Sequence, residues 1–459
     1  MSLAHWATDR TPLQSKVSRH VTSAATTPRQ VLECGCPLPP CDTKRGFESL
    51  SLRLALRDNS FTIYLRRSRN STLRRRKLVC ALKYAWVIFI GCSCSLSLFA
   101  QSLDYKPAPS SPLKVPGGGH SFVIGDVNKD GHIDLVVAEN NLSVMFGDGK
   151  GGFAPAPIPP TPLTGVGGEM LLADFNGDGF LDFAGSHHDR YEVVVLLGHR
   201  DGSFTKAPGS PFSARAPGKR PHTHALAAAD MNKDGKLDLI TANNEDGDIS
   251  VLLGNGKGGF TRAPASPFPC GRSPYPVAVA DVNGDNKLDI VVPNTAPGPT
   301  TITVLLGDGR GDFRAAPRSP FKANDRAYFV AVADLNGDGK PDIVATHDDT
   351  SIATLHLGDG KGNFVQPANS PLELGNRAWS VVPMDLNGDG KIDLAFGAEH
   401  GVAVFLGDGR GGFQRAAGSP FRTGRGTWRI EVVDVNHDGK PDFISNNVES
   451  NDISILLAQ

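Results

Sequence analysis

Oxygen-bearing side chains recur at alternate positions of the run VAVADLNGDGKPDIVAT, which spans residues 330–346. Asp334, Asn336, Asp338 and Asp342 take positions 1, 3, 5 and 9 of a nine-residue loop that has glycine at position 6. This order of oxygens matches the first nine positions of a calcium-binding loop, where position 7 contributes its backbone carbonyl. The spacing therefore predicts a Ca²⁺ site, whereas Mg²⁺ is disfavoured because it keeps most of its water ligands.

The same loop occurs seven times along the chain. Copy four has Asn286 instead of glycine at position 6, and asparagine is the next best residue for a left-handed backbone, so we expect that site to be retained. The alternative is that the copies are Asx-rich turns that bind no metal. The residues expected to bind up to seven Ca²⁺ ions, at positions 1, 3, 5, 7 (by its carbonyl) and 9, are Asp126, Asn128, Asp130, His132, Asp134; Asp174, Asn176, Asp178, Phe180, Asp182; Asp230, Asn232, Asp234, Lys236, Asp238; Asp281, Asn283, Asp285, Lys287, Asp289; Asp334, Asn336, Asp338, Lys340, Asp342; Asp385, Asn387, Asp389, Lys391, Asp393; Asp434, Asn436, Asp438, Lys440 and Asp442.

These loops do not have the features of an EF-hand. An EF-hand carries a bidentate acid at position 12 and is flanked by helices. The flanks here read as strands, such as VAVA before the loop and DIVV after it. Position 12 holds no acid in any copy: Val137, Gly185, Thr241, Val292, Ala345, Phe396 and Ser445. Both features exclude the EF-hand.

The segments between the loops predict the elements that position them. Successive loops begin 48, 56, 51, 53, 51 and 49 residues apart, a period typical of a repeat architecture. Each unit has an apolar run before the loop, another after it, a third such as TVLLG at 303–307, a glycine-rich turn and a fourth extended piece. Four strands in each of seven units predict an all-β fold, a seven-bladed β-propeller.

The chain ends predict how the ring closes. Residues 260–268, FTRAPASPF, are the outer strand and exit of one unit, and similar segments occupy 204–212 and 313–321. After the seventh loop the chain stops one strand short, at ISILLAQ. The missing piece stands before the first loop as YKPAPSSPL at 105–113. We therefore expect the N-terminal strand to pair with the strand around 453–457 and complete the last blade.

With these strands and loops, the repeated units resemble VCBS and FG-GAP repeats, a family that includes the propeller of integrin α-subunits. The likeness covers nearly all of residues 103–459 and rests on Asp-x-Asn-x-Asp-Gly-x-x-Asp between two apolar strands. The literal Phe-Gly…Gly-Ala-Pro signature is not clearly present, so VCBS is the closer name. The resemblance implies calcium loops between the first and second strands, on the lower face, and ligands on the opposite, upper face.

Charge divides the chain into two parts. Residues 1–100 contain 16 Lys and Arg and 5 Asp and Glu, whereas residues 101–459 contain 31 and 43, a net charge of −12. Seven Ca²⁺ ions would offset this excess, and without metal the acidic loops should repel one another. The negative charge argues against nucleic acid as a partner.

Segment 73–100 has the layout of a secretory signal peptide. Arg74–Lys77 form a basic start, residues 84–100 are mostly apolar, and a cleavage point follows Ala100. We therefore expect an exported protein, secreted or at the cell surface, whose mature part is a propeller over 101–459. A membrane anchor retained over 84–100 is the alternative, although this run is short for a span.

Residues 1–72 belong neither to the signal segment nor to the propeller. They are rich in Ser, Pro and Arg and show no convincing periodicity, so we expect a disordered extension or a start codon assigned too far upstream. Cys92 closes a run that faintly resembles a lipobox, and Cys34, Cys36 and Cys41 lack a completing pair of metal ligands. Six of the seven cysteines precede residue 95, so Cys270 leaves the propeller without an internal disulfide.

A second set of candidate residues stands six positions before each loop. These positions begin the innermost strands and should ring the upper mouth of the central channel, either as packing between blades or as exposed rings that stack on a ligand. They are His120, Gly168, His224, Tyr275, Tyr328, Trp379 and Trp428. Basic residues on the same face could receive an anionic ligand: Lys219, Arg220, Arg272, Arg326, Arg377 and Arg425.

Two classes of function fit this sequence. The first is a calcium-braced binding or adhesion module for a glycan or protein ligand. The second is a polysaccharide lyase or hydrolase that uses the channel mouth. Connections between second and third strands supply histidines and acids that an enzyme could use: His187, His188, Asp189, His347, Asp348, Asp349, Glu399 and His400. No nucleophile elbow, P-loop, dinucleotide fingerprint or zinc motif occurs, so binding is the preferred interpretation.

Overall fold

The computed structural model describes residues 52–57, 60–65, 103–115, 121–163, 165–215, 222–295, 300–324 and 326–459. The chain divides into two units, of which one includes residues 101–459 and the other spans 11–100. In the second unit, β1 (Leu52–Arg57) and β2 (Ser60–Leu65) form an antiparallel hairpin, which the sequence did not predict. The expected signal segment lies outside the described residues. In the described parts of the chain, no helix is long and apolar enough to cross a membrane.

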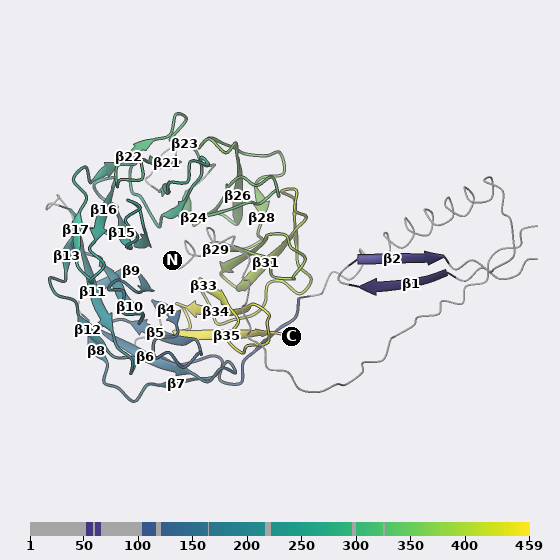
Figure 1. Ribbon diagram of the computed structural model, residues 1–459, viewed down its shortest axis with the longest axis horizontal. Coiled ribbons are helices and arrows are strands. Elements are labelled where there is room, and N and C mark those ends of the chain that lie inside the picture. Colours follow the sequence, from purple (N-terminus) through teal and green to yellow (C-terminus); the bar gives the residue numbers. More distant parts are fainter. Residues whose placement is uncertain are drawn as a thin grey trace, which may run out of the picture. The chain divides into compact units, whose positions relative to one another are not determined.

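Residues 103–459 form a ring of seven antiparallel sheets, as predicted (Figure 1). We number the blades by their loops along the chain. Blade 1 contains β4 (Phe122–Gly125), β5 (Asp134–Ala138), β6 (Asn141–Gly147), β7 (Phe153–Pro155) and β8 (Thr161–Pro162). Blade 2 contains β9 (Val166–Ala173), β10 (Asp182–His187), β11 (Glu192–Gly198), β12 (Phe204–Lys206) and β13 (Phe212–Ser213). Blade 3 contains β14 (Ala227–Ala229), β15 (Asp238–Asn243), β16 (Asp248–Gly254), β17 (Phe260–Arg262) and β18 (Phe268–Pro269).

The remaining four blades repeat this order. Blade 4 contains β19 (Ala278–Ala280), β20 (Asp289–Asn294), β21 (Thr301–Gly307), β22 (Phe313–Ala315) and β23 (Phe321–Lys322). Blade 5 contains β24 (Ala327–Ala333), β25 (Asp342–His347), β26 (Ile352–Gly358), β27 (Phe364–Val365) and β28 (Leu372–Glu373). Blade 6 contains β29 (Ala378–Met384), β30 (Asp393–Ala398), β31 (Gly401–Gly407) and β32 (Phe413–Arg415). Blade 7 contains β33 (Thr427–Val433), β34 (Asp442–Asn447), β35 (Asp452–Ala458) and β3 (Tyr105–Pro107).

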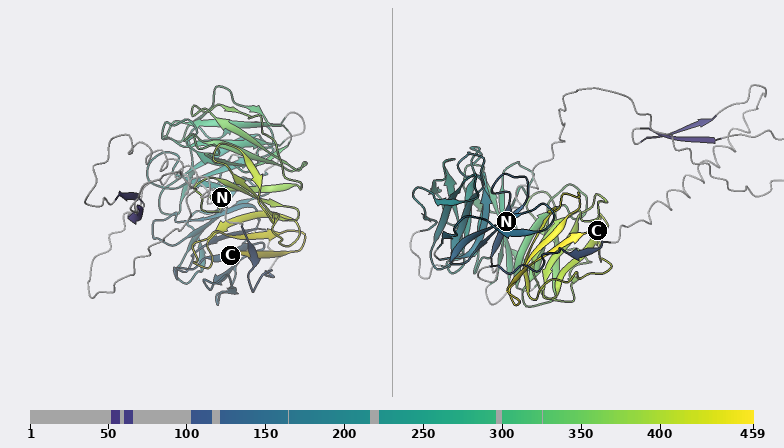
Figure 2. Two further views of the ribbon diagram at one scale, coloured as in Figure 1. Left: turned by 90° about the vertical axis from the view of Figure 1, so that its right-hand side faces the viewer. Right: turned by 90° about the horizontal axis from the view of Figure 1, so that it is seen from below.

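The closure prediction is confirmed. Strand β3 pairs with β35 in the register Tyr105↔Ala458, and a bridge between Leu113 and Ile453 extends the contact. In both side views the short blue strand lies beside the yellow C-terminal strands (Figure 2). The two ends of the propeller therefore share one blade, and no sheet edge is left where the ring would otherwise open.

In five blades a fifth, two-residue strand follows the fourth and pairs with the third. The sequence predicted this segment only as the exit of the unit and did not predict a fifth strand. The serine of the preceding Ser-Pro pair explains the contact, since Ser266 Oγ accepts the Val251 N–H at 3.1 Å. Ser210 repeats the contact with Val195 at 2.9 Å. The Ser-Pro motif thus fastens the outer turn to the third strand in blades 2 to 7, whereas blade 1 has Pro159 and Pro160 before its fifth strand and lacks the motif.

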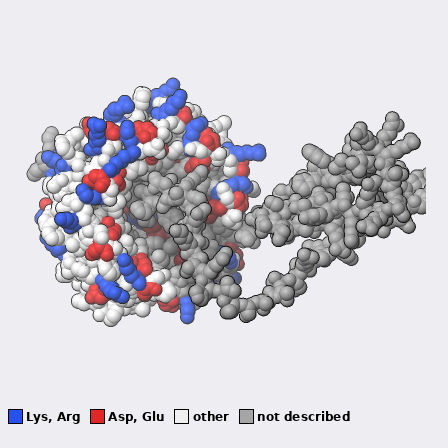
Figure 3. All heavy atoms as spheres, viewed as in Figure 1, with Lys and Arg blue, Asp and Glu red and all other residues white. Residues whose placement is uncertain are grey.

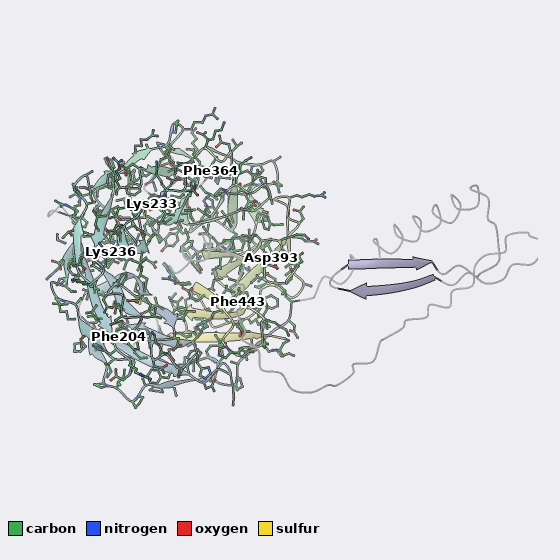
Figure 4. All side chains as sticks on the ribbon, in the orientation of Figure 1. Phe204, Lys233, Lys236, Phe364, Asp393 and Phe443 are labelled. Carbon is green, nitrogen blue, oxygen red and sulfur yellow. The ribbon has the colours of Figure 1, made fainter. Side chains whose placement is uncertain are left out.

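Burial follows the position of a strand within its blade. All six residues of β25 are buried, because both faces of the second strand pack against neighbouring blades. The outer strand β12 buries only its first residue, Phe204. Phe204, Phe364 and Phe443 lie within their blades and contribute to the apolar layers between neighbours (Figure 4). This packing leaves the loops at the two ends of the strands free to carry function.

Candidate functional sites

Each acidic loop joins the first and second strands of its blade and winds around the carboxylate of position 1. In blade 5, Asp334 Oδ1 accepts the N–H of Gly337 at 2.8 Å and of Asp338 at 3.1 Å. Asp334 Oδ2 accepts the Gly339 N–H at 2.8 Å. Asn336 Oδ1 accepts the Asp338 N–H at 2.9 Å, so the side chains of positions 1 and 3 share a donor. The loop therefore gathers its oxygens around a short stretch of backbone.

Two residues of every loop have a left-handed backbone. Position 6 has this conformation, as expected, and Asn286, which replaces glycine there, has φ of 60°. Position 4 also has a left-handed backbone, which the sequence did not predict. Glycine fills position 4 in four copies, but Lys129, Lys233 and His437 take it in the others with φ of 60–62°. The alternation of glycine with unrelated residues at position 4 was the available signal.

The aspartate of position 9 is fully buried in all seven loops. In blade 5, Asp342 Oδ2 accepts the Leu335 N–H at 3.0 Å and Oδ1 accepts the Gly358 N–H at 2.7 Å. This carboxylate therefore ties the loop to the end of the third strand. Burial raises the pKa of Asp342 to about 6, although both N–H bonds oppose the shift. The same cause raises the pKa of Asp289 to about 7.

Lysine at position 7 places a cation beside the loop. Lys340 Nζ lies 3.0 Å from Asp338 Oδ2, and the equivalent lysine in blade 6, Lys391, lies 2.9 Å from Asp389. Blades 3 and 4 repeat the pair, whereas blade 2 has Phe180 at this position. Lysine and arginine lie among the acidic side chains on the face seen in Figure 3. These exposed pairs neutralise part of the loop charge but stabilise the fold little.

The loops also contact the neighbouring blade. Gly258, in the outer turn of blade 3, donates its N–H to the carbonyl of Phe175, at position 2 of the loop in blade 2, over 3.1 Å. Lys129 in the first loop places its Nζ 4.6 Å from the ring centre of Phe180 in the second. Lys233 and Lys236 lie in the loop of blade 3 (Figure 4). Each loop is thus placed to couple two blades.

The opposite, upper face carries the aromatic positions. His224, Tyr275, Tyr328, Trp428 and Trp379 form a continuous row, which we call the aromatic row. Its successive ring centres are 4.4, 4.7, 5.7 and 5.7 Å apart. Blades 5 and 7 are not neighbours, so the contact between Tyr328 and Trp428 spans the mouth of the channel. The rings therefore pack on one another at the mouth of the channel.

Exposure differs along the row. Tyr328 is only 8% exposed, and burial raises its pKa strongly. Trp428 is 38% exposed and stacks on Trp379 at an interplanar angle of 10°. Arg377 lies with its guanidinium carbon 5.8 Å from the centre of the Trp379 ring. The tryptophan end of the row thus keeps accessible apolar surface next to a cation.

An ion pair crosses the channel beside these rings. Arg429 of blade 7 contacts Glu169 of blade 2 at 2.6 Å and Glu431 of its own strand at 3.1 Å. Blade 1 separates the two blades, so the pair joins residues 260 positions apart across the channel. Desolvation lowers the pKa of Arg429, but the two carboxylates outweigh it and raise the pKa.

A profile of the FG-GAP-like repeat matches six stretches: 126–185, 174–241, 230–292, 295–345, 334–396 and 385–445. The chain belongs to the FG-GAP-like repeat family. Five of these stretches each contain two consecutive acidic loops and 295–345 contains one, so together the matches include all seven loops and cover most of this FG-GAP-like propeller. It confirms the predicted family and leaves calcium binding as a prediction.

Other known proteins share parts of this propeller. Cartilage acidic protein 1 of Xenopus tropicalis is 26% identical over 149 residues, which are 30% of this chain and 23% of the relative. The chain thus matches under a quarter of that relative. The structure of BBS1N in complex with ARL6DN aligns with a TM-score of 0.52 at 12% identity, over 77% of this chain and 97% of the other. A lectin from Agrocybe aegerita that recognises non-reducing terminal N-acetylglucosamine aligns at 0.47 and 23% identity, over 64% and 78%. These structural likenesses concern the fold alone.

The remaining candidate residues of the FG-GAP-like propeller differ in whether the structure describes them and in what they contact. His120, Lys219 and Arg220 lie outside the described residues, and Gly168 offers no ring. Arg272, Arg326, Arg377 and Arg425 are all exposed, as a basic rim would be. Arg326 pairs with Asp348 at 3.3 Å.

The histidines and acids between second and third strands do not form one common site. His347 is fully buried, with its Nε2 3.0 Å from Thr354 Oγ1, whereas His400 is exposed. His188 instead meets His222 and His224 of the next blade. His222 was not among the residues that the sequence predicted. The signal for it is the run His-Thr-His at 222–224, because alternate residues of an extended chain face the same side.

Proposed function

We propose that this protein is an exported, calcium-braced binding module whose upper face binds a glycan. The carrying observation is the Trp428 side chain, which is 38% exposed and lies between Tyr328 and Trp379 in the aromatic row, stacked on Trp379. Singly exposed apolar side chains are common on protein surfaces, but Trp428 adjoins a second ring, Trp379, which has the Arg377 guanidinium near its face. A sugar presents a flat apolar face with a polar rim, and the tryptophan pair with Arg377 offers matching surface and charge.

The donor set of the acidic loops supports the calcium part of the proposal. Their oxygens come from carboxylates and an amide, the ligands that a hard cation prefers. Asp, Asn and Asp at positions 1, 3 and 5 would hold the ion, with the position 7 carbonyl and the buried position 9 carboxylate completing the set. The raised pKa of each position 9 carboxyl favours its protonated form. The positive charge of bound Ca²⁺ would oppose this and keep the carboxyl ionised. The ion would act as a brace and take no part in ligand chemistry.

The enzyme alternative has less support. A general base on this face would need a pKa near neutrality. Burial and Asp348 raise the pKa of Tyr275, and burial raises that of Tyr328 further. Neither tyrosine is therefore poised as a base, and the histidines and acids between second and third strands do not form one common site, so we prefer binding to catalysis.

Glycan-array binding in Ca²⁺ tests the proposal directly. We expect the Trp428→Ala variant to lose about tenfold or more in affinity for the glycans that bind the native chain, because one stacked aromatic contact is removed. Val365→Ala is the matched control, since Val365 is the other large exposed hydrophobic residue among those described and lies in the outer strand β27. Equal loss in both variants, or a ligand that proves to be a protein, would count against the glycan-binding surface.

Export is tested separately. We expect the native protein to begin near Gln101 and to be recovered outside the cytoplasm, because the segment before it has the order of a cleaved signal. N-terminal sequencing measures this. A chain that begins at Met1 in the cytosol would contradict both the signal and the misplaced start codon.

A further inference from the structure

Three histidines meet where blades 2 and 3 adjoin on the upper face. His188 follows strand β10 of blade 2, and His222 and His224 precede strand β14 of blade 3. One ring nitrogen from each lies within 4.8 Å of the others. The closest pair is His188 Nε2 and His222 Nε2, at 2.7 Å. All three side chains are partly exposed, so an ion could reach them from solvent.

A buried residue holds the two segments together. Thr223 is fully buried, donates its N–H to the His188 carbonyl at 3.1 Å and its hydroxyl to the Arg190 carbonyl at 3.2 Å, and forms a bridge with Asn243. Alternate residues of an extended chain face the same side, so His222 and His224 lie on one side of this segment, and their ring centres are 4.2 and 5.3 Å from that of His188. His224 is also fixed by stacking on Tyr275 at 4.4 Å. The cluster is therefore built into the junction of the blades.

Carboxylates stand behind two of the three rings. Asp189 Oδ1 lies 2.9 Å from His188 Nδ1, and Glu245 Oε1 lies 3.9 Å from His222 Nδ1. A carboxylate can only accept, so Asp189 favours the His188 tautomer with hydrogen on Nδ1 and a lone pair on Nε2. Glu245 lies beyond hydrogen-bond distance of His222 and places a negative charge beside that ring without fixing its tautomer. The lone pair of His188 Nε2 therefore faces the cluster, where it can accept a hydrogen bond from His222 or bind a cation.

We propose that His188, His222 and His224 form a transition-metal site of the zinc type, with Asp189 orienting His188 and Glu245 adding negative charge beside His222. Neutral imidazole is a preferred ligand of Zn²⁺ and its neighbours in the first row, and hydrogen bonding of the second ring nitrogen to a carboxylate is the usual support for such ligands. The site differs in chemistry from the acidic loops, whose oxygens suit Ca²⁺.

A metal held here would have three protein ligands and a position open to solvent. That arrangement can accept an oxygen from a water or from a bound ligand. The site lies at the histidine end of the aromatic row, beside Tyr275. The inference depends neither on calcium in the loops nor on a glycan ligand, because it rests on the blade junction alone.

Zn²⁺ binding to the full chain without an affinity tag, in saturating Ca²⁺, tests the site. Competition with a chromophoric chelator should show one Zn²⁺ more per chain than in the His222→Ala variant, with affinity reduced at least 100-fold by that change. Asp189→Asn alters only an exposed carboxylate and should weaken binding by about 10–100-fold. Co²⁺ in place of Zn²⁺ should give the visible absorption of a nitrogen-ligated ion in the native chain only.

The lower face supplies a matched control. His132 and His437 also form a close pair, with Nδ1 and Nε2 3.1 Å apart, but no third histidine joins them among the described residues. The double variant His132→Ala/His437→Ala should keep native Zn²⁺ affinity. Native affinity in both His222→Ala and Asp189→Asn, or loss of Zn²⁺ in the lower-face variant instead, would overturn the proposal. Thermal melting of each variant in Ca²⁺ alone confirms that it folds.

Discussion

At the scale of single residues, backbone conformation explains part of the loop sequence that metal binding does not. Position 4 has a left-handed backbone in every loop, yet Lys129, Lys233 and His437 occupy it in three of them. A residue with a Cβ costs roughly 1–2 kcal/mol in this conformation, and glycine avoids that cost. Lys129 and His437 are partly compensated by contacts with Phe180 and His132.

Lys233→Gly should therefore stabilise the protein. We expect the free energy of unfolding to rise by about 0.5–1 kcal/mol, the relief of backbone strain minus the extra flexibility of glycine when unfolded. Lys236→Gly, three residues on and without positive φ, is the control and should lower it. Urea unfolding of both variants in Ca²⁺ measures the difference. Stabilisation by both changes, or by neither, would contradict the backbone explanation.

At the scale of one element, the acidic loop combines a metal site with a hydrogen-bonded turn. The position 1 carboxylate organises the backbone, and the position 9 carboxylate fastens the loop to the third strand. Both tasks remain useful without metal, so the turn interpretation explains part of the pattern. Positions 3 and 5 also accept backbone N–H groups of the turn, since Asn336 Oδ1 accepts from Asp338 at 2.9 Å and Asp338 Oδ1 from Lys340 at 3.0 Å. A count of bound ions is therefore needed to separate the two interpretations.

Asp334→Ala tests one loop by itself. Native mass spectrometry should find one Ca²⁺ fewer than in the unmodified chain, with the other six loops still occupied, and blade 5 should be weakened. Lys340→Ala is the control within the same loop. It removes an exposed ion pair worth about 0–1 kcal/mol and leaves the backbone carbonyl in place, so the ion count should not change. An unmodified chain without bound Ca²⁺ would restore the turn interpretation.

The buried carboxyls also predict how calcium and pH interact. Burial raises the pKa of Asp134, Asp182, Asp238, Asp342 and Asp442 to about 6. The folded metal-free state thus binds these protons more tightly than the unfolded chain, so their contribution to stability is fully present below about pH 4 and is lost as pH rises through about 6. Ca²⁺ binding needs the ionised form and is opposed by protons.

We therefore expect the stabilisation by Ca²⁺ to shrink as pH falls. The gap between the melting temperatures in Ca²⁺ and in EDTA should be widest above about pH 7 and should narrow through about pH 6. Taking the difference at each pH cancels groups that titrate alike in both conditions, such as His356. A gap that stays constant or widens toward acid pH would show that these carboxyls do not bind the ion.

At the scale of the whole molecule, the ring depends on contacts between parts of the chain that are far apart in sequence. Tyr105 of β3 packs its ring 4.8 Å from Phe421 and 4.5 Å from Phe443, and so fills the last blade from the other end of the chain. Its hydroxyl is buried without a hydrogen-bond partner among the described residues. Across the channel, Arg429 holds Glu169 of another blade.

Two substitutions at Tyr105 separate the stabilisation by its packed ring from the cost of its buried hydroxyl. Tyr105→Ala should lower the free energy of unfolding by about 3–5 kcal/mol, because it removes the ring that seals the seam. Tyr105→Phe keeps that ring, removes an unpartnered hydroxyl and should be neutral or slightly stabilising. Denaturant unfolding in Ca²⁺ compares them. Equal destabilisation by both variants would mean that the hydroxyl, and not the packed ring, holds the blade.

Removal of calcium should act on the entire ring. Each loop contacts a neighbouring blade, and a ligand that binds only the folded state at a hundredfold excess over its Kd adds roughly 2.7 kcal/mol per site. We expect EDTA to lower the melting temperature sharply and Ca²⁺ to restore it better than Mg²⁺. Differential scanning calorimetry measures this, and an unchanged melting temperature would remove calcium as the brace.

The sequence by itself determined the blade count, the loop positions and the closing strand. These features are encoded locally: a nine-residue acid pattern and apolar runs recur in each unit, a Ser-Pro exit recurs in six of the seven, and the missing strand at one end is supplied at the other. The repeated loop pattern also predicted the left-handed backbone of Asn286. It did not predict the left-handed backbone at position 4, because the residue types vary at that position.

Only the tertiary structure decided which side chains meet on the upper face and in the channel. Arg429 and Glu169 belong to different blades and approach only when the ring is closed. The contact between Tyr328 and Trp428 skips a blade, and His188 meets His222 across a blade junction. Such pairings depend on the radius of the ring and the tilt of its blades, which arise from the packing of all seven sheets together and have no signature in any one repeat.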